Sequence, residues 1–371
     1  MPDPKPAPSM ADIARRAGVA KSTVSMALRN DPVISGKQTE RIQKIATKMG
    51  YRTNALVARL MHELRSSKKR KHVATLAFVN ASLESGRSHN PPSSIVQGWE
   101  SGAESRAAKL GYNLNHFWLH EPGLTPSRLA GIFHARNVQG VVFHSLGETA
   151  KARMSECEPI WSRFPLVTIG ARLESPALNY VSNDQYSTAL HACRRLLELG
   201  YKRIGLYMSS QVDNAADKRF VMGYRAGLEQ AEIKAPPVLY INRTNWDPQP
   251  HLKEDSGAFA AWLKKHRIEA CLAVNGHILD WTARLGMHLP DDLGIALLYL
   301  PKALQGKVAG MEHRLEWTGM AAIDTVVGQI LRNEFGIPSF QQGTLTESVW
   351  IDGPTVKPNA GRLERVCVVT A

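Results

Sequence analysis

The pattern that most constrains the fold begins at Val73, where short β-rich runs alternate with amphipathic helical segments. Alternation of this kind predicts parallel βαβ units. Helices are expected between the strands, for example at 95–110, 185–199 and 220–231. Two consecutive sets of such units predict two Rossmann-like lobes, with a ligand in the cleft that the strands' carboxyl ends face. The predicted strands are 73–79, 112–119, 140–144, 166–170, 203–208, 238–241, 270–274 and 295–300.

Positive charge is concentrated at the beginning of the chain. The formal net charge is +13, and residues 1–72 hold 16 Lys and Arg against 5 Asp and Glu. The rest of the chain holds 30 against 28 and is therefore almost neutral. A basic segment on a near-neutral body predicts a module that binds a polyanion, attached to a body whose work is not electrostatic.

Several classes of protein are disfavoured by what the sequence lacks. No apolar run approaches the roughly 18 residues of a membrane span, and the start, MPDPKPAPSM, has no apolar signal segment. We therefore expect a cytoplasmic protein with no membrane partner. The four cysteines are far apart and form no CxxC pair, which favours reduced thiols over disulfides or zinc. They are Cys157, Cys193, Cys271 and Cys367.

Signs of catalysis or of a bound metal are equally sparse. There is no P-loop, HExxH or GxSxG motif, so no enzyme activity and no cofactor are expected. His116 and His120 are four residues apart, but they lie in a strand-to-loop stretch rather than on one helix face, so no metal site is predicted there either.

The sequence of the basic segment predicts three short helices. A capping residue, Ser9, opens a first helix over 9–17, which Gly18 ends, and a second helix is expected over 21–29. Two short helices joined by a glycine turn predict a helix-turn-helix. A third helix is expected from a capping box at 35–38, with Ile42, Ile45, Ala46 and Met49 on its buried face. The second helix turns Lys21, Ser22, Ser25, Met26 and Arg29 away from this core.

The motifs DIARRAGV, STVS, VIS and GYRTNAL follow one another within about fifty residues of this segment. Together they resemble the DNA-binding module of the LacI family of bacterial transcriptional regulators. This resemblance implies a homodimer on a pseudo-palindromic operator, with the second helix in the major groove. Base contacts would fall on Lys21, Ser22 and Met26, with Arg29 adding charge attraction. Phosphate or orienting contacts would fall on Ser9, Thr23, Ser25, Ser35 and Asn54.

Two departures from the family pattern affect the reading helix. Met26 stands where the family usually has Arg, and methionine favours an apolar contact such as a thymine methyl group over guanine. Ala20 replaces the usual serine cap, which should weaken the start of the helix by about 1 kcal/mol. The operator sequence of relatives therefore does not transfer to this chain.

Residues 54–61, NALVARLM, match the hinge helix of the same family. The resemblance implies that Leu60 wedges between base steps in the minor groove. A helix this short is marginal alone, so we expect it to form when two copies meet on DNA. The expected domains are a head over 1–53, a hinge and linker over 54–72, and a two-lobed core for effector binding and dimerisation over 73–371.

The body resembles the family's effector-binding core, which is related to periplasmic sugar-binding proteins. The stretches 181–206 and 285–298 carry the likeness. Asn275-Gly276 replaces the usual Asn-Asp pair, so the carboxylate that commonly holds sugar hydroxyls is absent. The candidate effector residues are Asn80, Ser82, Arg219, Trp246 and Asn275.

These observations predict a sequence-specific transcriptional regulator, most simply a repressor, controlled by a small metabolite such as a sugar. The resemblance leaves open whether the metabolite weakens or strengthens DNA binding. Three other classes of protein are alternatives: a solute receptor, which would not need a basic head; an enzyme, which would need convergent acid and base groups; and a non-specific DNA-packaging protein.

Removal of residues 1–61 is expected to abolish tight operator binding and to leave a soluble core that still binds its ligand. The physical reason is that the whole helix-turn-helix is lost, together with 11 Lys and Arg against 4 Asp and Glu, which is a net charge of +7 out of the chain's +13. Gel-shift titration of the truncated and full-length proteins at fixed salt measures the effect. Equal operator affinity for the two would show that the domain assignment is wrong.

Overall fold

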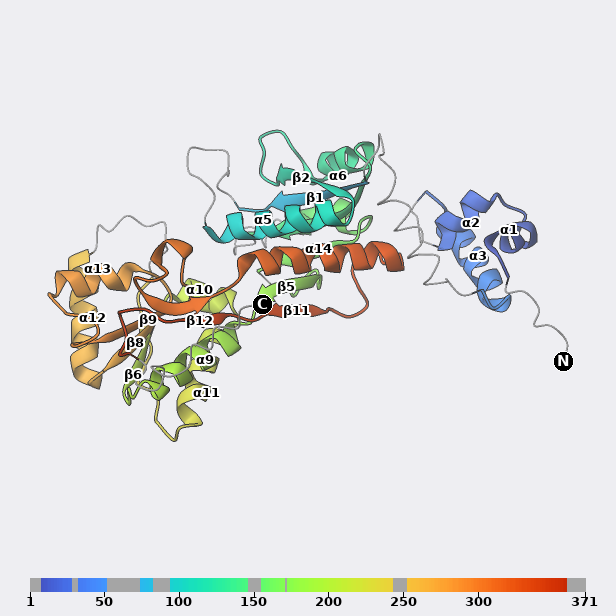
Figure 1. Cartoon of the computed structure of the whole chain (residues 1–371). Helices are drawn as coiled ribbons and strands as arrows, with labels where there is room; N and C mark the ends of the chain where they lie inside the picture. The colour runs from blue at the N-terminus through green and yellow to red at the C-terminus, as the bar shows by residue number, and fades with distance from the viewer. Residues whose placement is uncertain are drawn as a thin grey trace, which may run out of the picture. The chain divides into compact units, whose positions relative to one another are not determined.

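The computed structural model describes residues 8–28, 33–51, 74–82, 94–145, 155–170, 172–242 and 252–358 (Figure 1). The chain divides into two compact units. The first unit takes the chain up to Ser182 together with Leu315–Thr344, and the second takes Asn183–Arg314 together with the chain from Leu345. Each unit contains a six-stranded sheet, so the prediction of a helical head followed by an α/β core of two lobes is confirmed.

The basic head forms the three helices that the sequence predicts. They are α1 (Met10–Ala17), α2 (Lys21–Leu28) and α3 (Gly36–Lys48). Gly18 ends α1 with a φ of 66°, a left-handed conformation that glycine adopts at little cost. The three helices share a small core of Ile13, Ala14, Ala17, Val24, Ala27, Ile42 and Ala46. Ile45 and Met49 are half-buried at its margin rather than fully buried.

The sheet of the first unit has the strand order β11-β5-β4-β3-β1-β2, and its recorded pairings from β5 to β2 are parallel. Successive residues of β1 alternate between two apolar layers: Leu76 and Phe78 pack with α5 and α14, whereas Ala77 and Val79 pack with α6 and α8. Helices therefore cover both faces, as parallel sheets require. The elements are β1 (Ala74–Asn80), α5 (Ser94–Lys109), β2 (Tyr112–Trp118), α6 (Pro126–Ala135), β3 (Val138–His144), η1 (Ser155–Cys157), α8 (Glu158–Trp161), β4 (Leu166–Ile169), β5 (Asn179–Asn183), α14 (Leu315–Arg332) and β11 (Gly343–Thr346).

The sheet of the second unit has the order β12-β10-β9-β8-β6-β7 and is parallel except for the pairing of β12 with β10. One apolar cluster fills the unit, with Trp281, Tyr207 and Phe259 at its centre. The elements are α9 (Gln185–Glu198), β6 (Ile204–Met208), α10 (Ser210–Ala215), α11 (Arg219–Glu229), β7 (Leu239–Tyr240), α12 (Leu252–His266), β8 (Ala270–Ala273), α13 (His277–Arg284), β9 (Gly294–Leu297), η2 (Lys302–Leu304), β10 (Ala309–Glu312) and β12 (Val349–Ile351).

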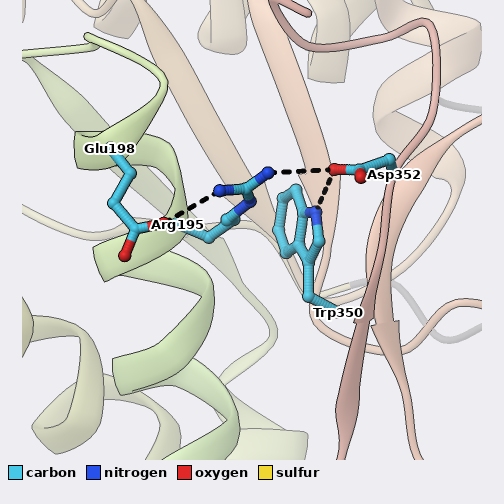
Figure 2. A network of polar contacts seen from close by, with 4 residues as sticks. All are labelled: Arg195, Glu198, Trp350 and Asp352. Carbon is cyan, nitrogen blue, oxygen red and sulfur yellow. Dashed lines mark hydrogen bonds and ion pairs between the residues drawn. The ribbon is translucent and has the colours of Figure 1, made fainter. Parts of the chain in front are cut away.

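A polar network joins α9 to the end of β12 (Figure 2). Arg195 on α9 lies 2.9 Å from a carboxylate oxygen of Glu198 and 3.5 Å from Asp352. The same oxygen of Asp352 accepts a hydrogen bond of 2.7 Å from the indole nitrogen of Trp350. Since β12 is reached only after the chain has passed through the other unit, this network ties a late segment back to the first helix of its own unit.

All eight predicted strands are present, with ends shifted by a few residues, and within the described ranges four further strands were missed. The missed strands are β5, β10, β11 and β12. Three of them are only three or four residues long, and β5 begins and ends with asparagine, so none contains the run of four or more apolar residues that marks a buried strand in sequence. None of the described helices combines the length and the apolar character that a bilayer span needs.

Glycine lets α5 and α14 pack with their backbones in close approach. A Cβ added at Gly102 would collide with the backbone carbonyl of Glu316, and one added at Gly319 would collide with the carbonyl of Trp99. Figure 1 shows the two helices running side by side. Neither obstacle is a flexible side chain, so the helices could accept a methyl group only by moving apart.

Gly102→Ala is expected to lower the free energy of unfolding by about 1–3 kcal/mol, because the added methyl group overpacks the contact between α5 and α14. Gly131→Ala on α6 is the matched control, since a Cβ there meets nothing within 4 Å. The control should stabilise the protein by up to about 1 kcal/mol through helix propensity. Urea denaturation of the full chain measures both, and equal effects of the two substitutions would contradict the packing argument.

Candidate functional site

Helix α1 is fixed at its start by a complete capping box. The hydroxyl of Ser9 accepts a hydrogen bond of 3.3 Å from the backbone N–H of Asp12 and donates one of 2.6 Å to the Asp12 carboxylate. The Asp12 carboxylate in turn accepts from the backbone N–H of Ser9 at 2.9 Å. These bonds to Ser9 lower the pKa of Asp12. Ser9, a predicted phosphate contact, therefore already has a structural role in positioning α1.

The reading helix α2 buries a narrow apolar face and exposes a polar one. Val24 and Ala27 are fully buried, whereas Lys21 and Ser22 are exposed and Met26 is half-exposed. Thr23 is also half-exposed. The structure thus brings the predicted base-contacting side chains together outside the core, on one short helix. The side chain of Ser25 and all of Arg29 lie outside the described residues.

The predicted capping box at the start of α3 is wrong. Ser35 is the N-cap residue, but its side chain makes no capping hydrogen bond, and its backbone carbonyl accepts from Gln38 and Thr39 instead. The exposed hydroxyl of Ser35 is therefore not used within the helix cap. Asn54, Leu60 and the predicted hinge helix lie outside the described residues.

Exposed positive side chains lie on all three helices of the head. Exposed basic residues lie in the last turn of α1 and along α3 as well as at the start of α2; they are Arg15, Arg16, Lys21, Lys37, Lys44 and Lys48. Exposed lysine and arginine side chains attract phosphate groups without reading sequence, whereas the short hydroxyl side chains of α2 allow close approach to base edges. The head can therefore combine backbone attraction with base contact.

In the first unit, Asn80 and Ser82 lie together at the carboxyl end of β1. The side-chain oxygen of Asn80 accepts a hydrogen bond of 2.8 Å from the backbone N–H of Ser82. Trp118, at the end of the neighbouring strand β2, donates to the backbone carbonyl of Ser82 at 2.8 Å, and His120 lies 3.1 Å from that of Ala81. These bonds hold the loop after β1 against the end of β2.

In the second unit, Asn275 follows β8 and is almost fully buried. Its side-chain oxygen lies 3.3 Å from the hydroxyl of Tyr207 and 3.1 Å from the backbone N–H of His277, and both groups donate to it. This amide oxygen therefore shapes the start of α13. Arg219 begins α11 and is half-buried, and Trp246 lies outside the described residues.

Sequence reasoning missed a buried carboxylate in the second unit. Asp213 is fully buried; one of its oxygens lies 2.8 Å from the hydroxyl of Tyr240 and 3.2 Å from the ammonium of Lys218. Its other oxygen and the hydroxyl of Ser209, both buried, have no hydrogen-bond partner among the described residues. The available signal was an acidic residue in SSQVDNAADKR, directly after a predicted strand.

The backbone beside this carboxylate adopts an uncommon conformation. Asp217 and Lys218 have φ values of 49° and 61°, a region that side-chain-bearing residues seldom occupy. Burial of the hydroxyl, which is the larger cause, and the hydrogen bond to Asp213 raise the pKa of Tyr240 to about 12. Ser209 and Tyr240 place the group at the carboxyl ends of β6 and β7, the edge of an open parallel sheet where ligands bind. Buried oxygens that lack partners there can accept hydrogen bonds from a hydroxyl or amino ligand.

Two histidines at strand ends are buried in the neutral form. His144 ends β3 and stacks on Phe78 with ring centroids 4.5 Å apart, and burial lowers its pKa to about 3. His313 follows β10 with its ring nitrogen 2.7 Å from the carbonyl of Leu298, and burial lowers its pKa to about 4. Burial also raises the pKa of Cys193 to about 12, so this thiol is unreactive at neutral pH.

Known proteins resemble this chain both in the three-helix head and over most of its length. A family model described as "Bacterial regulatory proteins, lacI family" matches residues 9–54, which include all three helices of the head. The HTH-type transcriptional regulator DegA of Bacillus subtilis (strain 168) is 24% identical over 291 residues, which are 76% of this chain and 79% of that protein. The regulator PtxS of Pseudomonas putida KT2440 is 22% identical over 334 residues, or 88% and 91% of the two chains.

Solved structures share the fold over nearly the whole chain. The structure titled "transcriptional regulator CelR-cellobiose complex" has a TM-score of 0.57 at 19% identity and covers 94% of this chain and 99% of its own. A lac repressor dimer bound to operator and the anti-inducer ONPF has a TM-score of 0.55 at 16% identity, with the same coverage of the two chains. Because the sequence identity is below 20%, this likeness establishes the fold alone.

The free energy of unfolding is expected to fall as the pH is lowered from about 6.5 to about 4, since the unfolded chain takes up protons that buried His144 and His313 refuse. Each histidine contributes a slope of up to about 1.4 kcal/mol per pH unit in this window. Urea denaturation at several pH values measures it. His144→Gln and His313→Gln should flatten the slope. An unchanged slope in both variants would contradict the assignment.

Proposed function

We infer that this chain, which belongs to the LacI family of bacterial regulatory proteins, is a repressor that binds a pseudo-palindromic operator as a homodimer. Proteins of this family are DNA-binding transcriptional regulators and not enzymes. The observation that carries the inference is the exposed polar face of α2, held outward by a core to which the same helix contributes Val24 and Ala27. The lac repressor dimer bound to operator, which has the same fold, supports the dimer.

For DNA recognition, we assign the major groove to α2. Lys21, Ser22 and Met26 would contact base edges, and Arg29 would add attraction to the phosphates. Ser9, Thr23, Ser25, Ser35 and Asn54 are proposed as phosphate or orienting contacts. Support for Ser35 comes from its exposed hydroxyl, which α3 does not use as a cap. For Ser9 an orienting role is favoured, since its hydroxyl already caps α1.

For control of DNA binding, we propose that residues 54–61 form a hinge helix when two copies meet on DNA, with Leu60 inserted into the minor groove. A helix of eight residues has little stability alone, so its formation can depend on how the cores present it. A ligand that favours one arrangement of the core would then change operator affinity, typically by about 1–3 kcal/mol.

For the effector, we propose a small polyhydroxylated metabolite, a sugar or a related compound. Cellobiose in the similar CelR structure supports this class. Asn80 and Ser82 in the first unit, and Arg219, Trp246 and Asn275 in the second, are the candidates from sequence. The unpartnered oxygens of Asp213 and Ser209 add two hydrogen-bonding positions that a ligand hydroxyl could use.

The direct test is selection of genomic fragments that the full-length protein binds, followed by competition with random duplex at the same salt. A regulator should prefer its site by about 10³-fold or more, because base contacts and shape readout add to phosphate attraction. Genes next to the selected sites would then suggest ligands for calorimetry. No preference between the selected site and random duplex would contradict the proposal and indicate non-specific packaging.

Met26→Arg is expected to change which base the reading helix prefers. Arginine can donate two hydrogen bonds to guanine, and such a pair is worth about 1–3 kcal/mol of discrimination. Repeating the selection with the variant should shift one position of each half-site toward guanine. Met222→Arg is the matched control, because Met222 is an exposed methionine on α11 of the second unit, outside the head. An unchanged preference in Met26→Arg would show that residue 26 does not contact a base.

A further inference from the structure

We propose that Gln43 of α3 is a positioning residue for DNA reading, because its side chain holds the carboxyl end of α2 in the orientation that presents Met26. The proposal rests on the function proposed above and adds a residue that does not itself contact DNA. Its basis is one hydrogen bond: the side-chain nitrogen of Gln43 donates to the backbone carbonyl of Ala27 at 3.0 Å.

Apolar packing alone holds α2 weakly. The helix has only eight residues, and the two side chains that it buries fully among those the structure describes, Val24 and Ala27, are small. Leu28 adds a half-buried contact at the margin of the core. A short helix held by so little apolar surface has few contacts that resist rotation about its axis or fraying of its last turn. A directional bond from a neighbouring helix supplies that resistance.

The acceptor of this bond, the backbone carbonyl of Ala27, lies in the last turn of α2, where carbonyl groups have no donor within the helix. The last four carbonyl groups of a helix have no intrahelical donor, and Ala27 is the last but one residue of α2. Ala27 also directly follows Met26 in the chain, so its carbonyl belongs to the turn that carries the proposed base contact. The bond therefore both satisfies the carbonyl and fixes the backbone next to Met26.

The donor is itself well anchored. Gln43 is partly buried on the 13-residue helix α3, beside the fully buried Ile42, and α3 contributes Ala46 to the same core. A second side chain of α3 acts in the same way on α1: the guanidinium of Arg41 donates to the carbonyl of Ala17, the last residue of that helix. Helix α3 thus holds the carboxyl ends of both shorter helices through polar side chains two residues apart.

The test compares substitutions at residue 43 that separate the donor from size and charge. Gln43→Met keeps the length and neutrality and removes the donor. Gln43→Glu places a carboxylate opposite a carbonyl, and Gln43→Lys restores a donor. Gln38→Met makes the same exchange as the first variant on the same helix, at a side chain with no recorded bond to α2 in the described part of the head. Each full-length protein is titrated with the selected operator and with random duplex at several salt concentrations.

Gln43→Met should lower the preference for operator over random duplex by about 2- to 10-fold, as expected for one lost hydrogen bond. Gln43→Glu should lower it at least as much, whereas Gln43→Lys and Gln38→Met should stay within about 2-fold of the unmodified protein, which is less than the expected loss. Affinity for random duplex should be unchanged in Gln43→Met, because phosphate attraction does not depend on the orientation of Met26.

Three results would overturn the proposal. The first is an unchanged preference in Gln43→Met, and the second is a loss of preference that Gln43→Lys shares. The third is a parallel fall in affinity for operator and random duplex, which would mean that Gln43 supports the fold of the head and not the orientation of α2. If the unmodified protein itself shows no preference, the proposed function fails, and that outcome is distinct from all three.

Discussion

The apolar contact among three short helices is the interaction on which DNA reading by this chain depends. Ile13, Val24 and Ile42 come from α1, α2 and α3 respectively, and all three are fully buried. Because this core uses only one narrow face of α2, the remaining side chains of that helix are left for contact with another molecule. Small buried residues let the helices lie close together but fix their relative orientation only weakly. Polar bonds supply that orientation, for example those of Ser9 with Asp12 and of Gln43 with Ala27.

The core of the protein contains two mainly parallel sheets, and in each of them groups that could bind a ligand lie at the carboxyl ends of the strands. Helices on both faces bury the strands, so ligand-facing groups can come only from the strand ends. Asn80 and Ser82 lie at such an end in the first unit, and Ser209 and Tyr240 do in the second. Asp213 stands out among the groups near these ends, because it is fully buried and one of its oxygens has no partner among the described residues, which is costly unless another group compensates the charge.

Sequence patterns predicted the head and the central strands because both rest on local chemistry. The capping residue Ser9, the turn at Gly18 and the spacing of Ile42 and Ala46 each act within a few residues of the chain. Strands β10 and β12 were missed because they are only four and three residues long and are stabilised by pairing with distant segments: β12 pairs with β10, and β10 pairs with β9 as well. The capping role predicted for Ser35 was wrong because a serine three residues before a glutamine fits the capping pattern whether or not its hydroxyl turns toward the helix. The cluster around Asp213 depends on contacts between β7 and α10, which no local pattern encodes.

The most direct test of the central claim is ultraviolet cross-linking of the full-length protein to its selected DNA site, with 5-iodouracil in place of thymine. This base carries its reactive iodine in the major groove, where thymine has its methyl group. Peptide mapping of the cross-linked protein should place the attachment within α2, at residues 21–28. Cross-links confined to residues from Ala74 onward would show that α2 is not the part of the protein that reads DNA.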